Sequence, residues 1–308
     1  MRGLLVVNPK ATTTTDVTRD VLISALADKF HLEVVTTTHR GHARELGLQA
    51  RAEGMDCILT LGGDGTIHEV VNGMLEQGPG PELPVLGTVP GGSANVFARA
   101  LGFPQDAVES TGLLLRAMRE GKTRTINLGR FEDTYFTFTA GIGIDAEIMT
   151  KMEQARADGK SASPTRYLAT TLRQFFGGTD RKEPALILHA PGAEPVEGVF
   201  LVIVQNTSPW TYFGAHPINP SPKASFDAGL DLWGTKSLRV PAALRLGTRM
   251  VFSRDRGSPK AIIAWHDMQE FRITATRPTP MQVDGEVVGE VTDITLRSVP
   301  RALRVYVP

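Results

Sequence analysis

A glycine-rich turn with one aspartate, Gly-Gly-Asp-Gly-Thr at residues 62–66, follows an apolar strand-like run and precedes a helix-like run. Glycines let the backbone pass close to a ligand, and the next helix offers free N–H groups and a positive dipole end to a phosphate. A plain strand-to-helix turn is the alternative interpretation of the glycines alone. Asp64 favours a binding site, because a carboxylate beside phosphates repels them unless a cation intervenes or the carboxylate acts as a base.

Two more turns along the chain have the same polar character. Residues 90–95, Pro-Gly-Gly-Ser-Ala-Asn, follow a later apolar run, and Asn8-Pro9 follow the first one. Because the carboxyl ends of parallel strands meet at one edge of a sheet, the three turns can face a single ligand. The set predicts a nucleotide site. The first of these turns, at residues 62–66, is not a Walker loop, because no Lys follows it. It is also not the dinucleotide fingerprint, because His68 stands where the third glycine should be.

The elements that must position these turns alternate along the first 120 residues. Continuous apolar runs alternate with segments of helical periodicity, which indicates a parallel sheet covered on both faces. The expected strands are residues 3–7, 32–37, 56–61 and 85–89, and the expected helices are 17–29, 42–53, 66–76 and 94–101.

After Thr125 the pattern of apolar residues changes to strand-like segments separated by Pro and Gly. The expected strands are 126–131, 135–139, 185–189, 199–204, 261–265, 271–276, 281–284 and 294–297, and the expected helices are 145–156, 166–176 and 241–252. We therefore predict an α/β nucleotide-binding domain at 1–127 and a β-rich, sandwich-like domain at 128–308. The last strand could return to the first domain, and a cleft between the domains is the expected ligand site.

Composition narrows the class of protein. The 308 residues contain 33 Lys and Arg and 33 Asp and Glu, a balance that argues against a dedicated nucleic-acid binder. The single cysteine, Cys57, excludes an internal disulfide and a cysteine zinc site, and we interpret it as a small apolar residue in a strand. No run approaches the roughly 18 to 20 apolar residues of a spanning helix. We expect a cytoplasmic protein without a transmembrane segment.

Residues 61–73 and 90–102, taken together, resemble the diacylglycerol kinase catalytic family. This family includes bacterial lipid kinases, sphingosine kinases and ceramide kinases, and it is distantly related to NAD kinases. Shorter matches follow in the family's order at residues 6–9, 140–145 and 283–286. The resemblance therefore spans nearly the whole chain.

The resemblance implies a kinase that uses ATP and Mg²⁺, with an active site between a nucleotide-binding domain and a β-rich domain. It assigns ATP binding to Asn8, Thr38, Gly62, Gly63, Asp64, Gly65, Thr66, Ser93 and Asn95. Asp64 would act in catalysis and meet the metal through Mg-ATP. The proton of the lipid hydroxyl would go to Asp284 or Glu286. For Asp284 a hairpin turn is the alternative, since Asp-Gly is a strong turn signal.

The chain departs from the family pattern at two positions. Val96 stands where many bacterial members have an Asp, and Ala228 stands where they have an acid beside a structural metal. Asp227 is the remaining candidate ligand for that metal. His39 and His42 are only three residues apart, but we interpret them as solvated loop residues because no cysteine or carboxylate follows at ligand spacing.

We expect the chain to phosphorylate the hydroxyl of a membrane lipid, with diacylglycerol giving phosphatidic acid as the leading case. The alternatives are a sphingoid-type lipid kinase, an NAD kinase, and a non-catalytic regulator that binds lipid or nucleotide. The sequence leaves a homodimer open. The enzyme would adsorb transiently to the inner face of the membrane. The residues that could do so are Arg245, Arg249, Arg254, Arg256, Lys260, Trp210, Tyr212 and Phe213.

Overall fold

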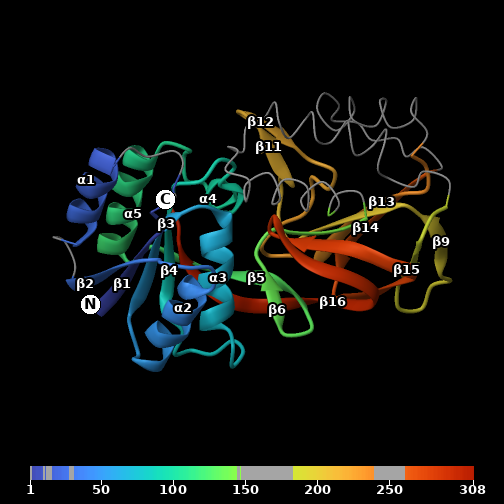
Figure 1. Ribbon diagram of the computed structural model, residues 1–308, viewed down its shortest axis with the longest axis horizontal. Helices are drawn as coiled ribbons and strands as arrows, with labels where there is room; N and C mark the ends of the chain where they lie inside the picture. Colours follow the sequence, from blue (N-terminus) through green and yellow to red (C-terminus); the bar gives the residue numbers. More distant parts are fainter. Residues whose placement is uncertain are drawn as a thin grey trace. The chain divides into compact units, whose positions relative to one another are not determined.

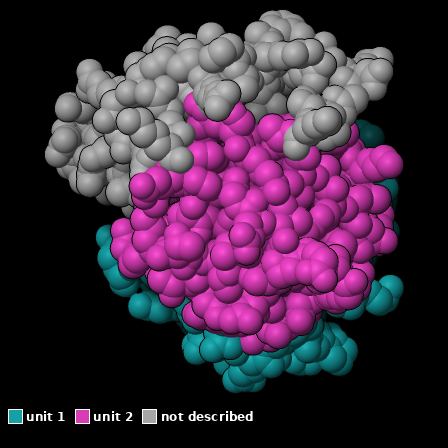
Figure 2. All heavy atoms as spheres, turned by 90° about the vertical axis from the view of Figure 1, so that its right-hand side faces the viewer, with its two compact units in different colours: residues 1–128, 133–135, 300–308 teal, residues 129–132, 136–299 magenta. Residues whose placement is uncertain are grey.

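The computed structural model describes residues 2–9, 11, 16–27, 31–143, 146, 183–238 and 261–308. The chain divides into two compact units, which Figure 2 colours separately. Unit 1 comprises residues 1–128, 133–135 and 300–308, and unit 2 comprises residues 129–132 and 136–299. The helices expected at 145–156, 166–176 and 241–252, and the basic residues from Arg245 to Lys260, lie outside the described residues.

Unit 1 is built on a parallel sheet. Its strands are β1 (Arg2–Val7), β2 (His31–Thr36), β3 (Cys57–Gly62) and β4 (Val85–Pro90), in the order β2-β1-β3-β4. The end of β16 (Glu286–Tyr306) adds to this sheet where Val305 pairs with Leu86 in parallel. Every residue of β3 and β4 is buried. This pattern explains the unbroken apolar runs, because a parallel sheet is covered on both faces. The predicted fold class is confirmed.

The helices of unit 1 cover both faces of this sheet (Figure 1). They are α1 (Asp16–Ala27), α2 (His42–Ala52), α3 (Asp64–Met74), α4 (Val96–Ala100) and α5 (Ala107–Glu120). Helix α1 packs against α5, and α2 packs against α3. The sequence analysis missed α5, although Asp106 accepts a hydrogen bond from Glu109 N (2.8 Å) and Gly121 ends the helix at φ 64°. These are the usual signals of a helix start and end.

Helices α2 and α3 touch through their backbones. A Cβ atom added at Gly73 would lie 2.0 Å from Arg44 O, and one added at Gly47 would lie 2.4 Å from Val70 O. Real Cβ atoms do not come this close to a carbonyl oxygen, so both positions require glycine. The Asn72-Gly73 end of the glycine-turn motif therefore sets how closely α2 packs against α3.

We expect Gly73→Ala to lower the free energy of unfolding by about 3 kcal/mol or more, because the two helix backbones must separate. Urea denaturation of the whole chain measures the change. The matched control is Gly112→Ala, since Gly112 lies exposed on α5 and an added Cβ there would meet nothing within 4 Å. That control should stabilise by about 0.4 to 1 kcal/mol. Equal effects of the two changes would contradict the packing argument.

Unit 2 is mainly antiparallel β-structure. Its strands include β7 (Thr139–Gly143), β8 (Leu186–His189), β9 (Val196–Val199), β10 (Leu201–Gln205), β13 (Leu230–Thr235), β14 (Ile262–Met268), β15 (Glu270–Val283) and most of β16. The main path runs β14-β13-β10-β7-β15-β16, and every neighbouring pair on it is antiparallel. Strands β5 (Thr123–Phe131) and β6 (Thr134–Phe136) pair with each other, and β11 (Thr211–Phe213) and β12 (His216–Ile218) form a separate two-stranded sheet.

One long strand replaces two expected ones. The sequence suggested separate strands at 271–276 and 281–284, but β15 continues from Glu270 to Val283. Its register against β16 shifts between Thr274 and Thr279, around the Arg-Pro-Thr-Pro stretch. Proline lacks the N–H that a regular ladder needs, so it occurs where pairing is irregular. The strand continues through this irregular pairing without ending.

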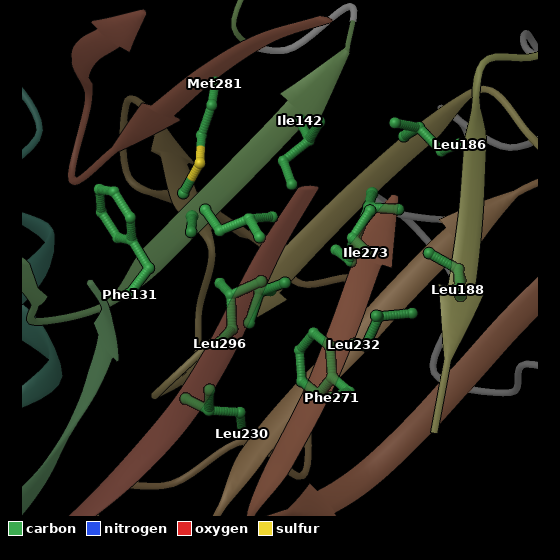
Figure 3. Close-up of a cluster of buried hydrophobic side chains, with 14 of the residues drawn as sticks. Phe131, Ile142, Leu186, Leu188, Leu230, Leu232, Phe271, Ile273, Met281 and Leu296 are labelled. Carbon is green, nitrogen blue, oxygen red and sulfur yellow. The ribbon is translucent and has the colours of Figure 1, made fainter. Parts of the chain in front are cut away.

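The core of unit 2 lies between its strands (Figure 3). Phe131, Ile142, Leu232, Phe271 and Met281 belong to this cluster and are almost fully buried. In unit 1, Cys57 lies buried in β3, where burial raises the pKa of its thiol to about 12. Cys57 is therefore an apolar packing residue and a poor nucleophile. Among the described residues, no helix has the length and apolar character needed to cross a bilayer.

Candidate functional site

The three polar turns predicted from the sequence meet at one edge of the unit 1 sheet. Asn8 N donates to Leu61 O (3.0 Å), which joins the end of β1 to the end of β3. Gly91 N donates to Gly62 O (2.8 Å), which joins the end of β4 to the end of β3. All three turns therefore follow the carboxyl ends of parallel strands, where open α/β sheets bind their ligands.

The two glycine turns lie against each other with backbone in contact. A Cβ atom at Gly92 would be 2.7 Å from Gly63 Cα, and one at Gly63 would be 3.1 Å from Gly92 Cα. Gly63 is also the N-cap residue of α3 and provides no side-chain acceptor for the first turn of that helix. The result is a helix N-terminus that opens from two side-chain-free loops, an arrangement suited to phosphate oxygens.

Asp64 connects the two turns. Its Oδ2 accepts a hydrogen bond from Val96 N (3.0 Å), and its Oδ1 accepts one from Phe97 N (3.1 Å). These donors are the first backbone amides of α4, so Asp64 caps α4 from the start of α3. The residue is half-buried, and its carboxylate lies at the contact between the two turns. Asp64 can therefore hold the loops together and still present negative charge beside them.

Asn95 shapes the second glycine turn from within. Its φ of 49° lies in the left-handed region, and its side chain both accepts from Gly92 N (2.8 Å) and donates to Gly92 O (2.6 Å). The residue is 1% exposed, whereas Ser93 is exposed at the tip of the same turn. Ser93 is thus the side chain that this turn presents outward, and Asn95 fixes its conformation.

Asn8 and Thr66 interact directly. Asn8 Nδ2 donates to Thr66 Oγ1 (3.0 Å), and a Cβ atom at Gly62 would lie only 2.7 Å from that same hydroxyl oxygen. The hydroxyl therefore has a fixed position at the start of α3. The contact also explains why Gly62 must be a glycine.

Thr38 follows β2 and is exposed beside two stacked imidazoles. The rings of His39 and His42 lie 5.0 Å apart and nearly parallel, and Thr38 Oγ1 is 2.9 Å and 3.2 Å from their Nδ1 atoms. His39 is an exposed loop residue, as the sequence suggested, whereas His42 is half-buried and is the first residue of α2. The described part of the chain holds no group of three or more His, Cys, Asp or Glu side chains that could bind a metal.

Glu69 holds the turn that carries Thr38. Glu69 Oε1 accepts from Gly41 N (2.9 Å) and Oε2 from Ala43 N (3.2 Å), so this carboxylate caps the N-terminus of α2. The sequence analysis quoted Glu69 within the motif but assigned it no task. Its partners lie 26 and 28 residues away, and no local pattern identifies them.

Asp284 and Gly285 form the two-residue turn between β15 and β16 in unit 2. Both have positive φ, 49° and 83°, which is typical of a tight hairpin turn. Asp284 Oδ2 accepts from Thr137 N (2.7 Å) and Thr137 Oγ1 (3.1 Å), and Oδ1 accepts from Phe138 N (3.0 Å) and Thr139 N (3.2 Å). Asp284 is 2% exposed, so these four donors surround a buried carboxylate.

Glu286 stands two residues further, at the start of β16, and is only partly buried. A carboxylate has about four lone-pair sites, and at Asp284 four donors already point at them. Of the two carboxylates at this turn, Glu286 is therefore the more accessible to a substrate.

Asp227, the candidate ligand for a structural metal, is exposed in unit 2, and its backbone N is 3.3 Å from Ser225 Oγ. Nearby, buried Asp231 accepts from Asp267 N (3.1 Å) and lies 2.7 Å from His266 Nδ1. The register of β13 against β14 shifts at this point, so Asp231 satisfies the irregular backbone of a β-bulge.

The arrangement in unit 1 defines a class of protein: an α/β domain with two glycine loops in contact at the carboxyl edge of a parallel sheet. The comparison with known families is more specific. Residues 2–131 match the model of the diacylglycerol kinase catalytic domain.

Two curated relatives and one solved structure illustrate the similarity. The chain is 39% identical over 108 residues to a diacylglycerol kinase of Bacillus subtilis, and 33% identical over 124 residues to one of Staphylococcus haemolyticus. These matches cover 35% and 40% of this chain, and 33% and 36% of the relatives. A diacylglycerol kinase structure from Bacillus anthracis is 21% identical and superimposes with a TM-score of 0.72, covering 100% of this chain and 97% of that one. The last match shows a shared fold over both units.

Proposed function

We propose that the protein is an ATP-dependent lipid kinase that transfers the γ-phosphoryl group to the hydroxyl of a membrane lipid, with diacylglycerol as the first candidate. The main support is the pair of glycine loops in backbone contact at the N-terminus of α3, joined by Asp64. The family of residues 2–131 supports the same reaction.

The nucleotide would bind to unit 1. Gly62, Gly63 and Gly65 would bring backbone amides to the phosphates, and Thr66 and Ser93 would add hydroxyl donors. Asn8 would orient the hydroxyl of Thr66, to which it already donates. Thr38, exposed at the end of β2, would contact the nucleotide from the neighbouring turn.

The residues present also fit Mg²⁺ bound with the nucleotide. Magnesium favours one or two carboxylates together with phosphate oxygens, and Asp64 places a half-buried carboxylate beside the phosphate-binding loops. The metal would neutralise charge on the transferred phosphoryl group. The departure at Val96 is compatible with this site, since its side chain is buried while its backbone N–H binds Asp64.

The proton of the lipid hydroxyl would go to Glu286. A general base needs an oxygen that the substrate can reach, and Glu286 is partly exposed whereas Asp284 is surrounded by four donors. Asp284 then serves to hold the turn from which Glu286 projects. The chain's own groups thus bind and orient the phosphates in unit 1 and accept the proton in unit 2.

The deciding experiment offers the purified protein radiolabelled ATP and Mg²⁺ with diacylglycerol, sphingosine, ceramide or NAD in turn. We expect labelled phosphatidic acid. Labelled sphingosine, ceramide or NAD product would move the proposal to one of the alternative acceptors. ATP binding without any labelled product would favour the non-catalytic regulator.

A protein that acts on a lipid must adsorb to the bilayer, and the hairpin of β11 and β12 carries two candidate side chains. Trp210 and Tyr212 are partly exposed there, and Trp210 N donates to Ile218 O (3.1 Å). Amphipathic aromatics favour the membrane interface. We expect Trp210→Ala with Tyr212→Ala to weaken binding to vesicles by about tenfold, or ~1.4 kcal/mol, in a sedimentation assay.

The matched control for that experiment is Val288→Ala, which removes an exposed apolar side chain elsewhere in unit 2. It should leave vesicle binding unchanged. Unaltered binding of the aromatic double variant would move the adsorbing surface to the basic residues between Arg245 and Lys260. Charge reversal of those residues, compared on neutral and anionic vesicles, tests that second surface.

A further inference from the structure

A short segment of the chain is held at both ends by side chains from the two motif regions. The segment is residues 135–139, which we call the strap. Its first residue belongs to unit 1, and the rest belongs to unit 2. The chain does not re-enter unit 1 until Pro300.

Asn72 holds the first residue of the strap. Its Oδ1 accepts from Tyr135 N (2.8 Å), and its Nδ2 donates to Tyr135 O (2.9 Å), so one side chain satisfies both backbone groups of one residue. Asn72 is 6% exposed, and its Nδ2 also donates to His68 O (2.9 Å) within α3. The strap is therefore tied to the helix whose N-terminus forms the phosphate-binding turn.

Asp284 holds the rest of the strap. Its carboxylate receives the backbone N–H groups of Thr137, Phe138 and Thr139, and Asp284 N donates back to Thr139 O (2.9 Å). Only Phe136, which is fully buried, separates the residue held by Asn72 from the first residue held by Asp284. The covalent chain thus joins α3 to the turn that carries Glu286.

We propose that Asn72 and Asp284 are positioning residues that act through the strap, so that the phosphate-binding helix and the Glu286 turn are coupled. Because a misplacement of about 1 Å at a reacting group can reduce a rate about 10²-fold, loss of this coupling should lower kcat. The kinetic consequence rests on the proposed function. The coupling itself does not, because it concerns hydrogen bonds that exist without substrate.

Amide hydrogen exchange on the full chain tests the coupling without any activity. In Asn72→Ala, we expect exchange at Thr137, Phe138 and Thr139 to become about tenfold faster or more, although Asn72 does not bind them. Strand β13 of unit 2 serves as the internal reference and should not change. The matched control is Asn127→Ala, because Asn127 also accepts a backbone N–H in unit 1, from Arg301 (2.9 Å), a residue outside the strap. It should leave exchange at 137–139 as in the wild type.

Two exchange results would overturn the proposal. Faster exchange limited to Tyr135 and α3 would mean that the loss of Asn72 does not reach the part of the strap held by Asp284. An equal increase in the strap and in β13 would mean that Asn72 only stabilises the fold. If Asn72→Ala does not fold, Asn72→Asp replaces it, since Asp keeps the acceptor for Tyr135 N but loses the donor for Tyr135 O.

Kinetics with the lipid substrate give the second readout. Asn72→Ala should lower kcat about 10- to 100-fold while the dissociation constant for ATP changes less than about threefold. The double variant Asn72→Ala with Asp284→Asn should have a kcat only slightly below that of the more damaging single variant, because both residues act through one segment. Fully additive losses, or an equal loss of ATP affinity, would refute the shared route. If the wild type phosphorylates no lipid, the proposed function fails, and the exchange result still decides the coupling.

Discussion

Glu286→Gln should lower kcat for the lipid by about 10²- to 10⁴-fold, the range expected when a general base is removed. The substitution keeps the size of the side chain but removes the basic oxygen. KM for ATP should stay near that of the wild type, because the nucleotide-binding residues lie in unit 1 and Glu286 lies in unit 2. The free energy of unfolding should also stay unchanged within about 0.5 kcal/mol, since Glu286 is partly exposed.

Asp284→Ala should behave differently, because it leaves four donors around an empty buried site. We expect a loss of about 3 kcal/mol or more in the free energy of unfolding, together with a loss of activity. Urea denaturation and steady-state kinetics on the same preparations separate the two residues. Glu290→Gln, a change to an exposed acid on the same strand, is the control and should alter neither quantity.

The opposite pattern would reverse the assignment of the base. Full stability with a 10²-fold or larger loss of kcat in Asp284→Ala, and near-normal kcat in Glu286→Gln, would make Asp284 the proton acceptor. Such a result would require the four hydrogen bonds to Asp284 to rearrange when substrate binds.

The fold could be predicted from the sequence where burial alone dictates the pattern. The strands β1, β3 and β4 are buried on both faces, so each appears as a continuous apolar run. The continuity of β15 was harder to predict, because its prolines suggest an end to the strand whereas the antiparallel partner β16 continues past them. Pairing with the next strand, β16, overrides the local signal there.

The site could be predicted only in part, for the same reason. The glycine turns follow from spacing, since the carboxyl ends of parallel strands meet at one edge. The tasks of Glu69, Asn72 and Asp284 do not follow from spacing, because their partners lie 26 to 28, 63 and 145 to 147 residues away. A sequence motif identifies such side chains, but the tertiary structure decides whether they face a ligand or the backbone.

Asp64→Asn is the second change for which we expect a large effect. We expect kcat to fall at least about 10²-fold, because the substitution acts on the metal site and on the loops together. The amide nitrogen of the new side chain would face either Val96 N or Phe97 N, so one donor meets another donor and one hydrogen bond is lost. The negative charge that would attract Mg²⁺ beside the phosphates is lost as well.

Nucleotide binding in the presence and absence of Mg²⁺ separates these two contributions. If charge dominates, Asp64→Asn should abolish the gain in ATP affinity that Mg²⁺ gives the wild type, yet bind metal-free ATP about as well. Asp106→Asn is the matched control, because Asp106 also caps a helix through one oxygen and Asn caps equally well there. A loss of metal-free ATP affinity as large as the loss of kcat would instead identify Asp64 as the residue that holds the two loops in place. Retention of more than about a tenth of the wild-type kcat, a loss below ~1.4 kcal/mol, would exclude both roles.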